Sequence, residues 1–381
     1  MQTEPAGIYI HVPFCLRKCR YCDFYSVAQL NQRDAFVKAL QREIELAPDP
    51  GPVDSLYFGG GTPSLLDPDQ VAAILTAARA RFEFLSDVEI TLEANPGTVD
   101  KATLTDFKTA GVNRLNLGIQ SFENRQLAFL GRIHTATEAR QSIEAARAAG
   151  YSNLGLDLIY GLPGQNPVEM AREVEAAVAP EPEHLSCYLL TYEQGTPLDK
   201  DREFGKVTPL PEKDAADLFL EIRKLLSAHG YRQYEISNFA RSEQYFSRHN
   251  QKYWNFAPYI GLGPAAHSFI EPVRYWNHRE LPDYLSDLEK GQPPVRAKET
   301  LTQSQQMIEA VYLGLRQTRG ISIPDFNHRF AVDFQTFFQK VLSDPTLDAL
   351  LEVDEKSCRL TPEGMLVMNT VVGRFVDVIP F

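Results

Sequence analysis

Between Gly7 and Tyr192 the sequence alternates short apolar runs with longer amphipathic segments, and this alternation restricts the fold more than any other feature. The apolar runs are typical of strands buried on both faces, and the amphipathic segments are typical of helices that cover a parallel sheet. Six such units, closing partly around one axis, predict an α/β fold: a partial (β/α)6 barrel of the TIM type. The predicted strands are GIYIHV, SLYFGG, VEITLEA, RLNLGIQ, LGLDLIYG and HLSCYLL.

The rest of the chain predicts an extension of this barrel and a small C-terminal domain. We expect EQGTPLDKDREFGKV to form a loop, and the aromatic-rich segments YRQYEISNF, RHNQKYWNF and YIGLGPAAHSF to form irregular strands and loops. GQPPVRAKETL, with glycine, prolines and no apolar period, indicates a linker. The prediction is therefore a barrel domain over residues 1–290 and a helical, winged-helix-like domain over residues 300–381, with a hairpin at LLEVDEKSCRLT and a last helix opening at TPEG.

The charge of the chain argues against nucleic acid as a partner. The formal net charge is −12, and residues 301–381 carry seven basic against ten acidic side chains. Winged-helix domains often bind DNA, but an acidic field repels phosphate backbones and anionic lipid. We therefore expect the C-terminal domain to pack against the barrel.

Three of the five cysteines lie together after the first predicted strand, as Cys15, Cys19 and Cys22 in the segment HVPFCLRKCRYCDFYS. Three thiolates in one loop can hold a [4Fe-4S] cluster and leave one iron without a protein ligand. A structural zinc ion is the alternative, but zinc prefers four closed ligands and would have to recruit His11 or a distant residue. The spacing and the loop position favour the cluster.

Cys187 and Cys358 stand alone in apolar surroundings, and we expect both to be buried and unreactive. This use of cysteine is typical of a reducing compartment, because it offers one thiolate cluster and no disulfide framework. The opening segment MQTEPAGIYIHVP has neither a basic start nor a long apolar stretch. We therefore expect a cytoplasmic protein.

The C-x3-C-x2-C segment, with Tyr21 before its last cysteine, resembles the signature of the radical S-adenosylmethionine (SAM) family. The resemblance implies that the open iron binds the amino and carboxylate groups of SAM. It also implies that an electron from the cluster cleaves the sulfonium to a 5′-deoxyadenosyl radical. In such proteins the cofactors carry the chemistry and the chain supplies position and electrostatics.

Polar groups and glycines stand near the ends of the predicted strands, where barrels of this type form their sites. The glycines 59–61 in YFGGGTP, which Thr62 follows, have no side chains that would keep a ligand from the backbone. Lone carboxylates near apolar strands need a partner. Each of these residues alone could be a structural polar group. The resemblance implies that the set contacts SAM, together with Tyr9 and with Arg132, which could instead be a surface residue. The candidate SAM residues are Tyr9, Gly60, Gly61, Thr62, Glu93, Gln120, Arg132 and Asp157.

Within the family, the chain resembles the group that contains oxygen-independent coproporphyrinogen III oxidase and the HemW-type heme chaperones. The resemblance runs through IYIHVPFC, YFGGGTPS, EANPG, LGIQSF, DLIYGLPGQ, HNQKYWNF and GLGPAAHSF. The oxidase type carries a fourth cysteine where this chain has Phe24, and it has an additional N-terminal segment, whereas the first strand predicted here begins within about ten residues of Met1. Both differences favour the chaperone type.

The chaperone type carries the motif H-N-x-x-Y-W, which here is HNQKYW with His249, Tyr253 and Trp254. A heme site needs an axial ligand and flat aromatic walls, which these residues could supply. His267 is a weaker ligand candidate. The motif could also be ordinary core, with the imidazole hydrogen bonded to its surroundings.

The resemblance implies a heme chaperone with a [4Fe-4S] cluster and exchangeable SAM, which transfers heme to acceptors such as membrane respiratory proteins and receives electrons from a donor. The alternative is an oxygen-independent oxidase that decarboxylates a porphyrinogen. The sequence leaves open whether the chain turns over a substrate at all and whether it forms a homodimer.

Overall fold

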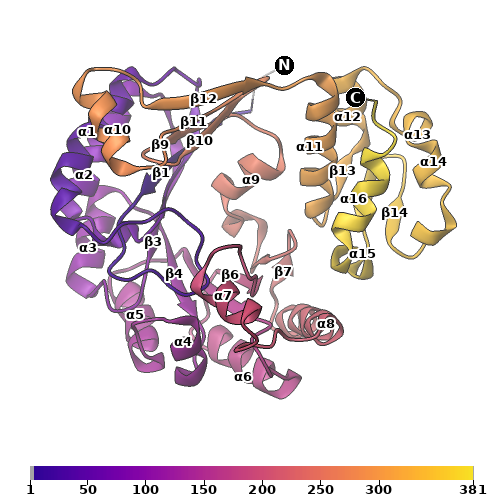
Figure 1. Ribbon diagram of the computed structural model, residues 1–381, viewed down its shortest axis with the longest axis horizontal. Coiled ribbons are helices and arrows are strands. Elements are labelled where there is room, and N and C mark those ends of the chain that lie inside the picture. Colours follow the sequence, from indigo (N-terminus) through magenta and orange to yellow (C-terminus); the bar gives the residue numbers. More distant parts are fainter. Residues whose placement is uncertain (1–3, 381) are drawn as a thin grey trace.

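A computed structural model describes residues 4–380 and contains one large mixed sheet (Figure 1). Six neighbouring strands run parallel in chain order and curve into an open barrel, which confirms the predicted α/β fold. Their inward side chains enclose the space in which the candidate site lies. The strands are β1 (Ala6–Val12), β2 (Val53–Gly60), β3 (Phe84–Ala94), β4 (Arg114–Gln120), β5 (Leu154–Tyr160) and β6 (His184–Leu189).

Helices connect these strands and cover the outer side of the barrel (Figure 1). Their boundaries follow ordinary capping signals. The Asp100 side chain accepts from Thr103 N at the start of α3, Thr135 and Glu138 form a capping box at α5, and Gly111 ends α3 with a left-handed backbone. The helices are α1 (Arg33–Leu46), α2 (Pro68–Arg81), α3 (Lys101–Ala110), α4 (Asn124–Leu130), α5 (Ala136–Ala148), α6 (Pro167–Val178) and α8 (Glu212–Ala228).

The sheet extends beyond the six parallel strands at both edges and contains twelve strands. On one side β9 pairs parallel to β1, and β10, β11 and β12 follow as antiparallel strands; on the other side β8 and β7 follow β6. The added strands are β7 (Arg232–Gln233), β8 (Asn238–Ala240), β9 (Tyr259–Leu262), β10 (His267–Ile270), β11 (Val273–Asn277) and β12 (Val295–Thr300).

Three sequence-based expectations about these regions were wrong. The expected loop contains α7 (Pro197–Glu203), because Thr196 caps a helix that has proline at its first position. The HNQKYW motif is not irregular but forms α9 (Arg248–Trp254), which the Ser247 side chain caps. The expected linker contains β12, which pairs with β11 at the edge of the sheet. In each case the composition of the segment favoured irregular structure, but a capping residue or a strand partner from another part of the chain determined a regular element.

The sheet extension is fixed to the barrel helices by one buried carboxylate, Glu43 on α1. It accepts hydrogen bonds from Gly263 N at 2.7 Å, Asn277 Nδ2 at 2.5 Å and Tyr284 Oη at 2.7 Å, the last on α10 (Leu281–Glu289). Burial raises the pKa of Glu43 to about 7, and the three donors oppose that rise. The three donors depend on this one carboxylate.

Replacing Glu43 by alanine is therefore expected to lower the free energy of unfolding by about 3 kcal/mol, because it leaves these buried donors without an acceptor. Urea unfolding followed by circular dichroism measures the change. Glu45 is exposed on the same helix, so Glu45→Ala is the matched control and should shift stability by no more than about 0.5 kcal/mol. Equal stability of the two variants would contradict the role assigned to Glu43.

The C-terminal region is mainly helical and carries a three-stranded antiparallel sheet in the order β13-β15-β14. The predicted hairpin forms between β14 and β15, and the last helices begin after Thr361 in TPEG, as expected. Cys358 is buried here and Cys187 is buried in the barrel; burial raises the pKa of each thiol to about 12. The elements are α11 (Gln303–Arg316), β13 (Ile321–Ser322), α12 (Ile323–Phe330), α13 (Phe334–Phe337), α14 (Gln339–Leu342), β14 (Leu351–Val353), β15 (Ser357–Leu360), α15 (Pro362–Leu366) and α16 (Met368–Val376).

Within residues 4–380, none of the helices has both the length and the apolar character needed to cross a membrane. Figure 1 shows α9 in the space between the curved sheet and the C-terminal region. This helix contacts β1 and β2 on one side and α11 on the other. It therefore joins the barrel interior to the C-terminal region.

Candidate functional site

One cavity of about 720 Å³ lies inside the barrel, toward the carboxyl ends of its strands. This volume is within the usual range for small-molecule sites. The three cysteines and seven of the eight candidate SAM residues line it, although they are spread over more than 140 residues of sequence. The lining includes Cys15, Cys19, Cys22, Gly60, Gly61, Thr62, Glu93, Gln120, Arg132 and Asp157.

Backbone hydrogen bonds hold the cysteine loop at both ends. Cys15 N donates to Val27 O at 3.0 Å, and Val27 N donates to Pro13 O at 2.7 Å. In the middle of the loop, Arg20 forms an ion pair with Asp201 at 2.5 Å and donates to Phe129 O at 2.9 Å. The loop is therefore fixed against α4 and α7, so α7, which the sequence analysis missed, supports the site.

Two other site residues contact the cysteine sulfurs. Thr62 Oγ1 lies 3.5 Å from Cys15 Sγ, and Arg132 Nη1 donates to Cys19 Sγ at 3.4 Å. Among residues 4–380, no three His, Cys, Asp or Glu side chains converge on one point that would hold a single ion. A cluster does not require such convergence, because each of its cysteines binds a different iron. The arrangement of the loop thus fits a cluster better than a closed zinc site.

The glycines at the end of β2 bring the backbone close to the cysteine loop. Gly60 has φ +107°, a conformation that favours glycine. A Cβ on Gly61 would lie 2.5 Å from Phe14 O, and Thr62 N donates to that same carbonyl at 2.7 Å. Any side chain at position 61 would therefore displace the backbone next to Cys15, so this cradle requires glycine.

Two partly buried carboxyl groups, on β3 and β5, face the cavity. Glu93 accepts from Tyr57 Oη at 2.7 Å, and Asp157 Oδ2 accepts from Asn116 Nδ2 at 2.6 Å, while Asp157 Oδ1 has no partner among the described residues. Burial raises the pKa of Glu93 to about 7 and that of Asp157 to about 6. A buried carboxylate oxygen without a partner is costly unless a ligand satisfies it. These two groups are suited to the cationic and hydroxyl groups of a nucleoside ligand.

Gln120 and Arg132 complete the polar side of the cavity. Gln120 ends β4 with φ +67°, which is unfavourable for a residue other than glycine and is typical of functional sites. Arg132 donates to Gly118 O at 2.7 Å and to Asn95 Oδ1, while its buried Nε has no partner among the described residues. Arg132 thus lines the cavity, and the alternative of a free surface residue is wrong. The unpartnered Nε and Asp157 Oδ1, together with the glycine cradle, fit a ligand of the size and polarity of SAM.

Tyr9 and the HNQKYW residues lie outside this cavity, in an aromatic group next to it. The His249 ring stacks on Tyr57 and Tyr9, with ring centroids 5.3 and 6.0 Å apart. Both His249 nitrogens have partners: Nδ1 lies 3.4 Å from Ser55 Oγ and Nε2 lies 2.9 Å from Tyr253 Oη. Burial and the nearby Lys252 lower the pKa of His249 to about 3. His249 is 1% exposed, and both ring nitrogens have partners. Binding of iron by this ring would therefore require one of these contacts to break.

The same aromatic group nevertheless connects to the cavity, because Tyr57 stacks on His249 and donates its hydroxyl to Glu93. Trp254 lies at the end of α9 under the guanidinium of Arg316, which lines the cavity. His267 lies apart on β10, stacked on Trp276. The roles of His249, Tyr253, Trp254 and His267 in heme binding stay predictions.

Sequence reasoning missed several residues that line the cavity. Asn95 and Asn116, which hold Arg132 and Asp157, could have been suspected because they occur in the same strand-end motifs as Glu93 and Gln120. Arg316 could not, because it belongs to the C-terminal region and no motif marks it.

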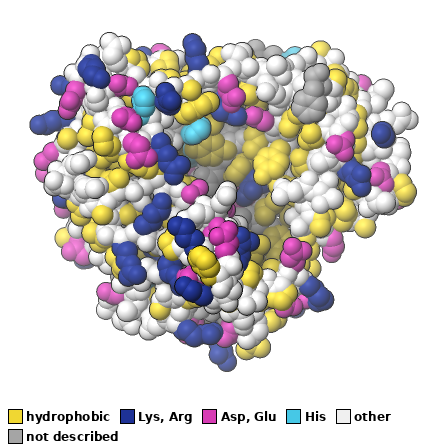
Figure 2. Space-filling view, in the orientation of Figure 1, with side chains coloured by type: hydrophobic (Ala, Val, Ile, Leu, Met, Phe, Trp, Pro, Cys, Tyr) yellow, Lys and Arg dark blue, Asp and Glu magenta, His cyan; other side chains and the backbone are white. Residues whose placement is uncertain are grey.

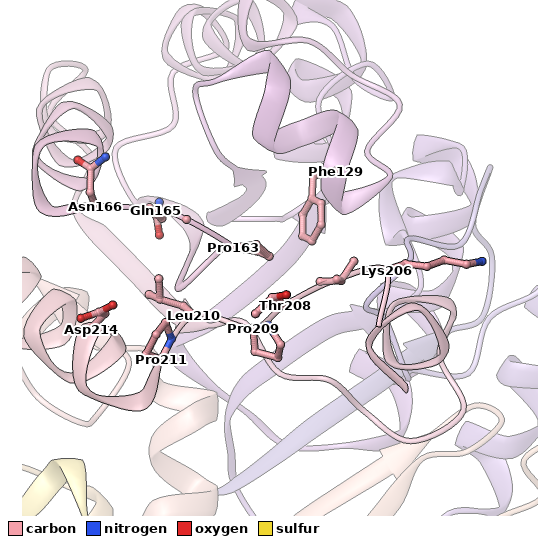
Figure 3. Close-up of a pocket in the computed structure, with 12 residues that line it drawn as sticks. Phe129, Pro163, Gln165, Asn166, Lys206, Thr208, Pro209, Leu210, Pro211 and Asp214 are labelled. Atoms are coloured by element: carbon pink, nitrogen blue, oxygen red, sulfur yellow. The ribbon is translucent and has the colours of Figure 1, made fainter. Parts of the chain in front are cut away.

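Two smaller cavities lie elsewhere. One, of about 550 Å³, lies between Phe129, the loop 163–166 and the segment 206–214, and its lining includes three prolines, Pro163, Pro209 and Pro211 (Figure 3). The other, of about 350 Å³, lies between α9, the strands β9 to β11 and α11, and Tyr253 is among its lining residues. Neither contains the cysteines or the carboxyl groups described above.

Comparison with known proteins places this geometry in a family. The model of the radical SAM superfamily matches residues 9–177, and that of the HemN C-terminal domain matches residues 301–367. The protein named Heme chaperone HemW of Bacillus subtilis (strain 168) is 34% identical over 373 residues, covering 97% of this chain and 98% of the relative. The protein of that name from Escherichia coli (strain K12) is 42% identical over 277 residues, 71% of each chain.

Among solved structures, coproporphyrinogen III oxidase (HemN) from Escherichia coli, described as a radical SAM enzyme, superposes with a TM-score of 0.84 at 24% identity. The superposition covers 98% of this chain and 90% of that one, and it shows the shared fold. The cysteine loop, the cavity and the similarity to the B. subtilis relative over 98% of its length all indicate the same family. The chain belongs to the HemW family of radical SAM proteins.

Proposed function

We propose that the chain is a heme chaperone, which binds heme and transfers it to acceptor proteins while carrying a [4Fe-4S] cluster with exchangeable SAM. The observation that carries this proposal is the full-length similarity to proteins named Heme chaperone HemW, 34% over 97% of the chain in the B. subtilis protein. Phe24, which stands where the oxidase type has a cysteine, further supports it: its side chain is 68% exposed at the cavity.

Each residue group of the cavity has a task in this proposal. Cys15, Cys19 and Cys22 would bind three irons of the cluster, and the fourth iron would be available to SAM. When bound, the cluster and SAM supply one-electron chemistry. Arg132 and Thr62 orient the cysteine side chains, as their contacts with Cys19 and Cys15 indicate. The glycine cradle would admit the ligand to the backbone, and the partly buried carboxyl groups would bind its cationic and hydroxyl groups.

The proposed partners follow from this role. We expect the acceptors to be heme-containing respiratory proteins of the membrane, and we expect an electron donor to reach the cysteine loop, where Leu16 and Phe24 are exposed. Cysteine thiols that await a cluster must stay reduced, which suits the cytoplasm. Size-exclusion chromatography with light scattering would test whether a homodimer forms.

The decisive test combines two assays on one anaerobically reconstituted sample. Titration with heme is expected to produce a saturable Soret band, and incubation with coproporphyrinogen, SAM and reductant is expected to give no sustained decarboxylation. A sample that turns over coproporphyrinogen steadily would be an oxidase and would refute the chaperone proposal. A sample that shows no Soret band would refute it as well.

His249→Ala is expected to weaken the Soret band, because the motif is predicted to supply a heme ligand. Since this change also leaves Ser55 Oγ and Tyr253 Oη without their partner, thermal unfolding must accompany the titration. The control is His229→Ala, which removes a partly exposed histidine that pairs with Glu175 at the surface. If the His249 variant folds and keeps an unchanged Soret band, the motif does not ligate heme.

A further inference from the structure

The cavity that contains the cysteines has two unlike halves. The half next to the cysteine loop is polar and carries the carboxyl groups and Arg132. The other half is formed by the carboxyl ends of β5 and β6, the segment that follows β6 and the turn before β8, and most of its side chains are apolar. Tyr188 and Leu189 of this half are exposed, and Figure 2 shows hydrophobic side chains inside the hollow between the barrel and the C-terminal region. The far half includes Ile159, Tyr188, Leu189, Leu190, Thr191, Glu193, Ile236, Ser237 and Arg316.

Arg316 is the one cation of this far half, and it comes from the C-terminal region, at the end of α11. Its Nε forms an ion pair with Glu235 Oε2 at 2.8 Å. Glu235 is 0% exposed and also accepts from Ser237 N at 3.0 Å. The contact is an ion pair without the geometry of a hydrogen bond, so Glu235 positions the guanidinium by its charge.

The flat face of the same guanidinium is fixed by Trp254 on α9, because the Arg316 Cζ lies 4.5 Å from the centre of the Trp254 ring. Gln317 Nε2 donates to Trp254 O at 2.9 Å and holds the two elements together. Within residues 4–380 the terminal Nη atoms of Arg316 make no hydrogen bond, and its side chain is 21% exposed. An arginine held on two sides, with its terminal nitrogens free at a cavity, is preorganised to bind an anion.

We propose that Arg316 binds a carboxylate of the ligand that enters the apolar half of the cysteine cavity. This inference rests on the proposed function, under which that ligand is heme. It concerns a propionate of heme and not the iron, whose predicted ligand His249 lies next to this cavity, stacked on Tyr57, which donates to Glu93 of the cavity wall. Heme is a flat apolar macrocycle with two propionates, and it therefore matches an apolar wall that carries a single guanidinium. For the carboxylate of SAM another cation is available, because Arg132 lies beside the cysteine loop and contacts Cys19.

The cavity beside Tyr253 is the competing site, since it has aromatic walls and contains Arg274. There, however, the guanidinium already pairs with Glu309 at 2.5 Å and with Glu299 at 3.3 Å. A ligand carboxylate would have to displace one of these. The volume of about 350 Å³ is also near the lower limit for ligand sites. The observations therefore favour Arg316.

The test compares the binding of heme with that of heme dimethyl ester, which has the same macrocycle but no carboxylate. The wild-type protein should bind heme roughly tenfold to a hundredfold more tightly than the ester, the range expected for one charge-assisted hydrogen-bonding pair. In Arg316→Gln this ratio should fall to about one, while affinity for the ester changes little. Arg374→Gln is the control, because Arg374 is an exposed arginine on α16 of the same C-terminal region and does not line the cavity.

Arg316→Gln alone leaves Glu235 buried without its cation and could fail to fold, so the double variant Glu235→Gln, Arg316→Gln is measured beside it. A ratio unchanged in the folded single or double variant would overturn the assignment, and so would a ratio that collapses in Arg274→Gln instead. Equal wild-type affinity for heme and ester would overturn this inference alone. Absence of binding to both would overturn the proposed function and this inference with it.

Discussion

Cys19→Ala protein, reconstituted without oxygen, is expected to contain only residual iron and sulfide, whereas the wild type should contain about four irons per chain. Loss of one thiolate removes a ligand from a site that has three, and the remaining two cysteines cannot hold the cluster against competing thiols in solution. Cys19 also accepts a hydrogen bond from Arg132, so its loss leaves that guanidinium beside an empty position. Iron and sulfide analysis and the visible absorption spectrum measure the outcome.

The matched control is Cys358→Ala, which removes a buried thiol in the C-terminal region that is not among the residues lining the cavity. This variant should keep its full iron and sulfide content. If Cys19→Ala kept the wild-type content, or if the wild type bound zinc without inorganic sulfide, the assignment of the loop to a cluster would be wrong.

Glu93→Gln is expected to weaken SAM binding to the cluster-loaded protein by about 2–5 kcal/mol, the cost of removing one member of a buried charge pair. SAM carries an ammonium and a sulfonium, and an ionised Glu93 would stabilise either. Calorimetric titration without oxygen measures the affinity. Glu193 is exposed at the same cavity, so Glu193→Gln is the control and should leave the affinity almost unchanged.

The carboxyl group of Glu93 is also expected to make SAM binding depend on pH. Burial raises the pKa of Glu93 to about 7 in the free protein, so below that pH the carboxyl is protonated and must lose its proton to pair with a cation. Affinity should therefore rise with pH up to about 7 and level off above it. In Glu93→Gln this step should disappear, and only the weaker step of Asp157, with a pKa of about 6, should remain. A variant that kept the step near pH 7 would show that another group binds the cation.

Much of the barrel and of the polar half of the cavity could be predicted, because local sequence patterns determine both. The six parallel strands follow from apolar runs, and parallel strands bring their carboxyl ends to one edge, so Glu93, Gln120 and Asp157 had to meet. The cysteine loop follows the first strand and therefore joins them. The strand patterns and the cysteine spacing can be recognised locally, although the ion pair Arg20–Asp201 and the hydrogen bond Arg132–Cys19, which hold the loop in place, are contacts between distant parts of the chain.

The parts that could not be predicted depend on such contacts. The segment of α9 contains aromatic residues that favour strands, and its short helix is stabilised by packing against β1, β2 and α11. The sequence of β12 has no apolar period, so nothing local predicts a strand there. It is a strand because it pairs with β11. Arg316 enters the cavity because α11 packs beside α9, a contact between residues that are more than 60 positions apart. The position of His249 inside an aromatic stack has the same origin.

The position of β12 as an outermost strand of a twelve-stranded sheet has a consequence for behaviour at high concentration. An open edge exposes unpaired backbone groups to which another molecule could add a strand, which is a common route to aggregation. Arg296, Lys298 and Glu299 are exposed along this edge. A neighbouring molecule that extended the sheet would have to desolvate these charges, so the polar sequence of β12 protects the protein against fibrous self-association.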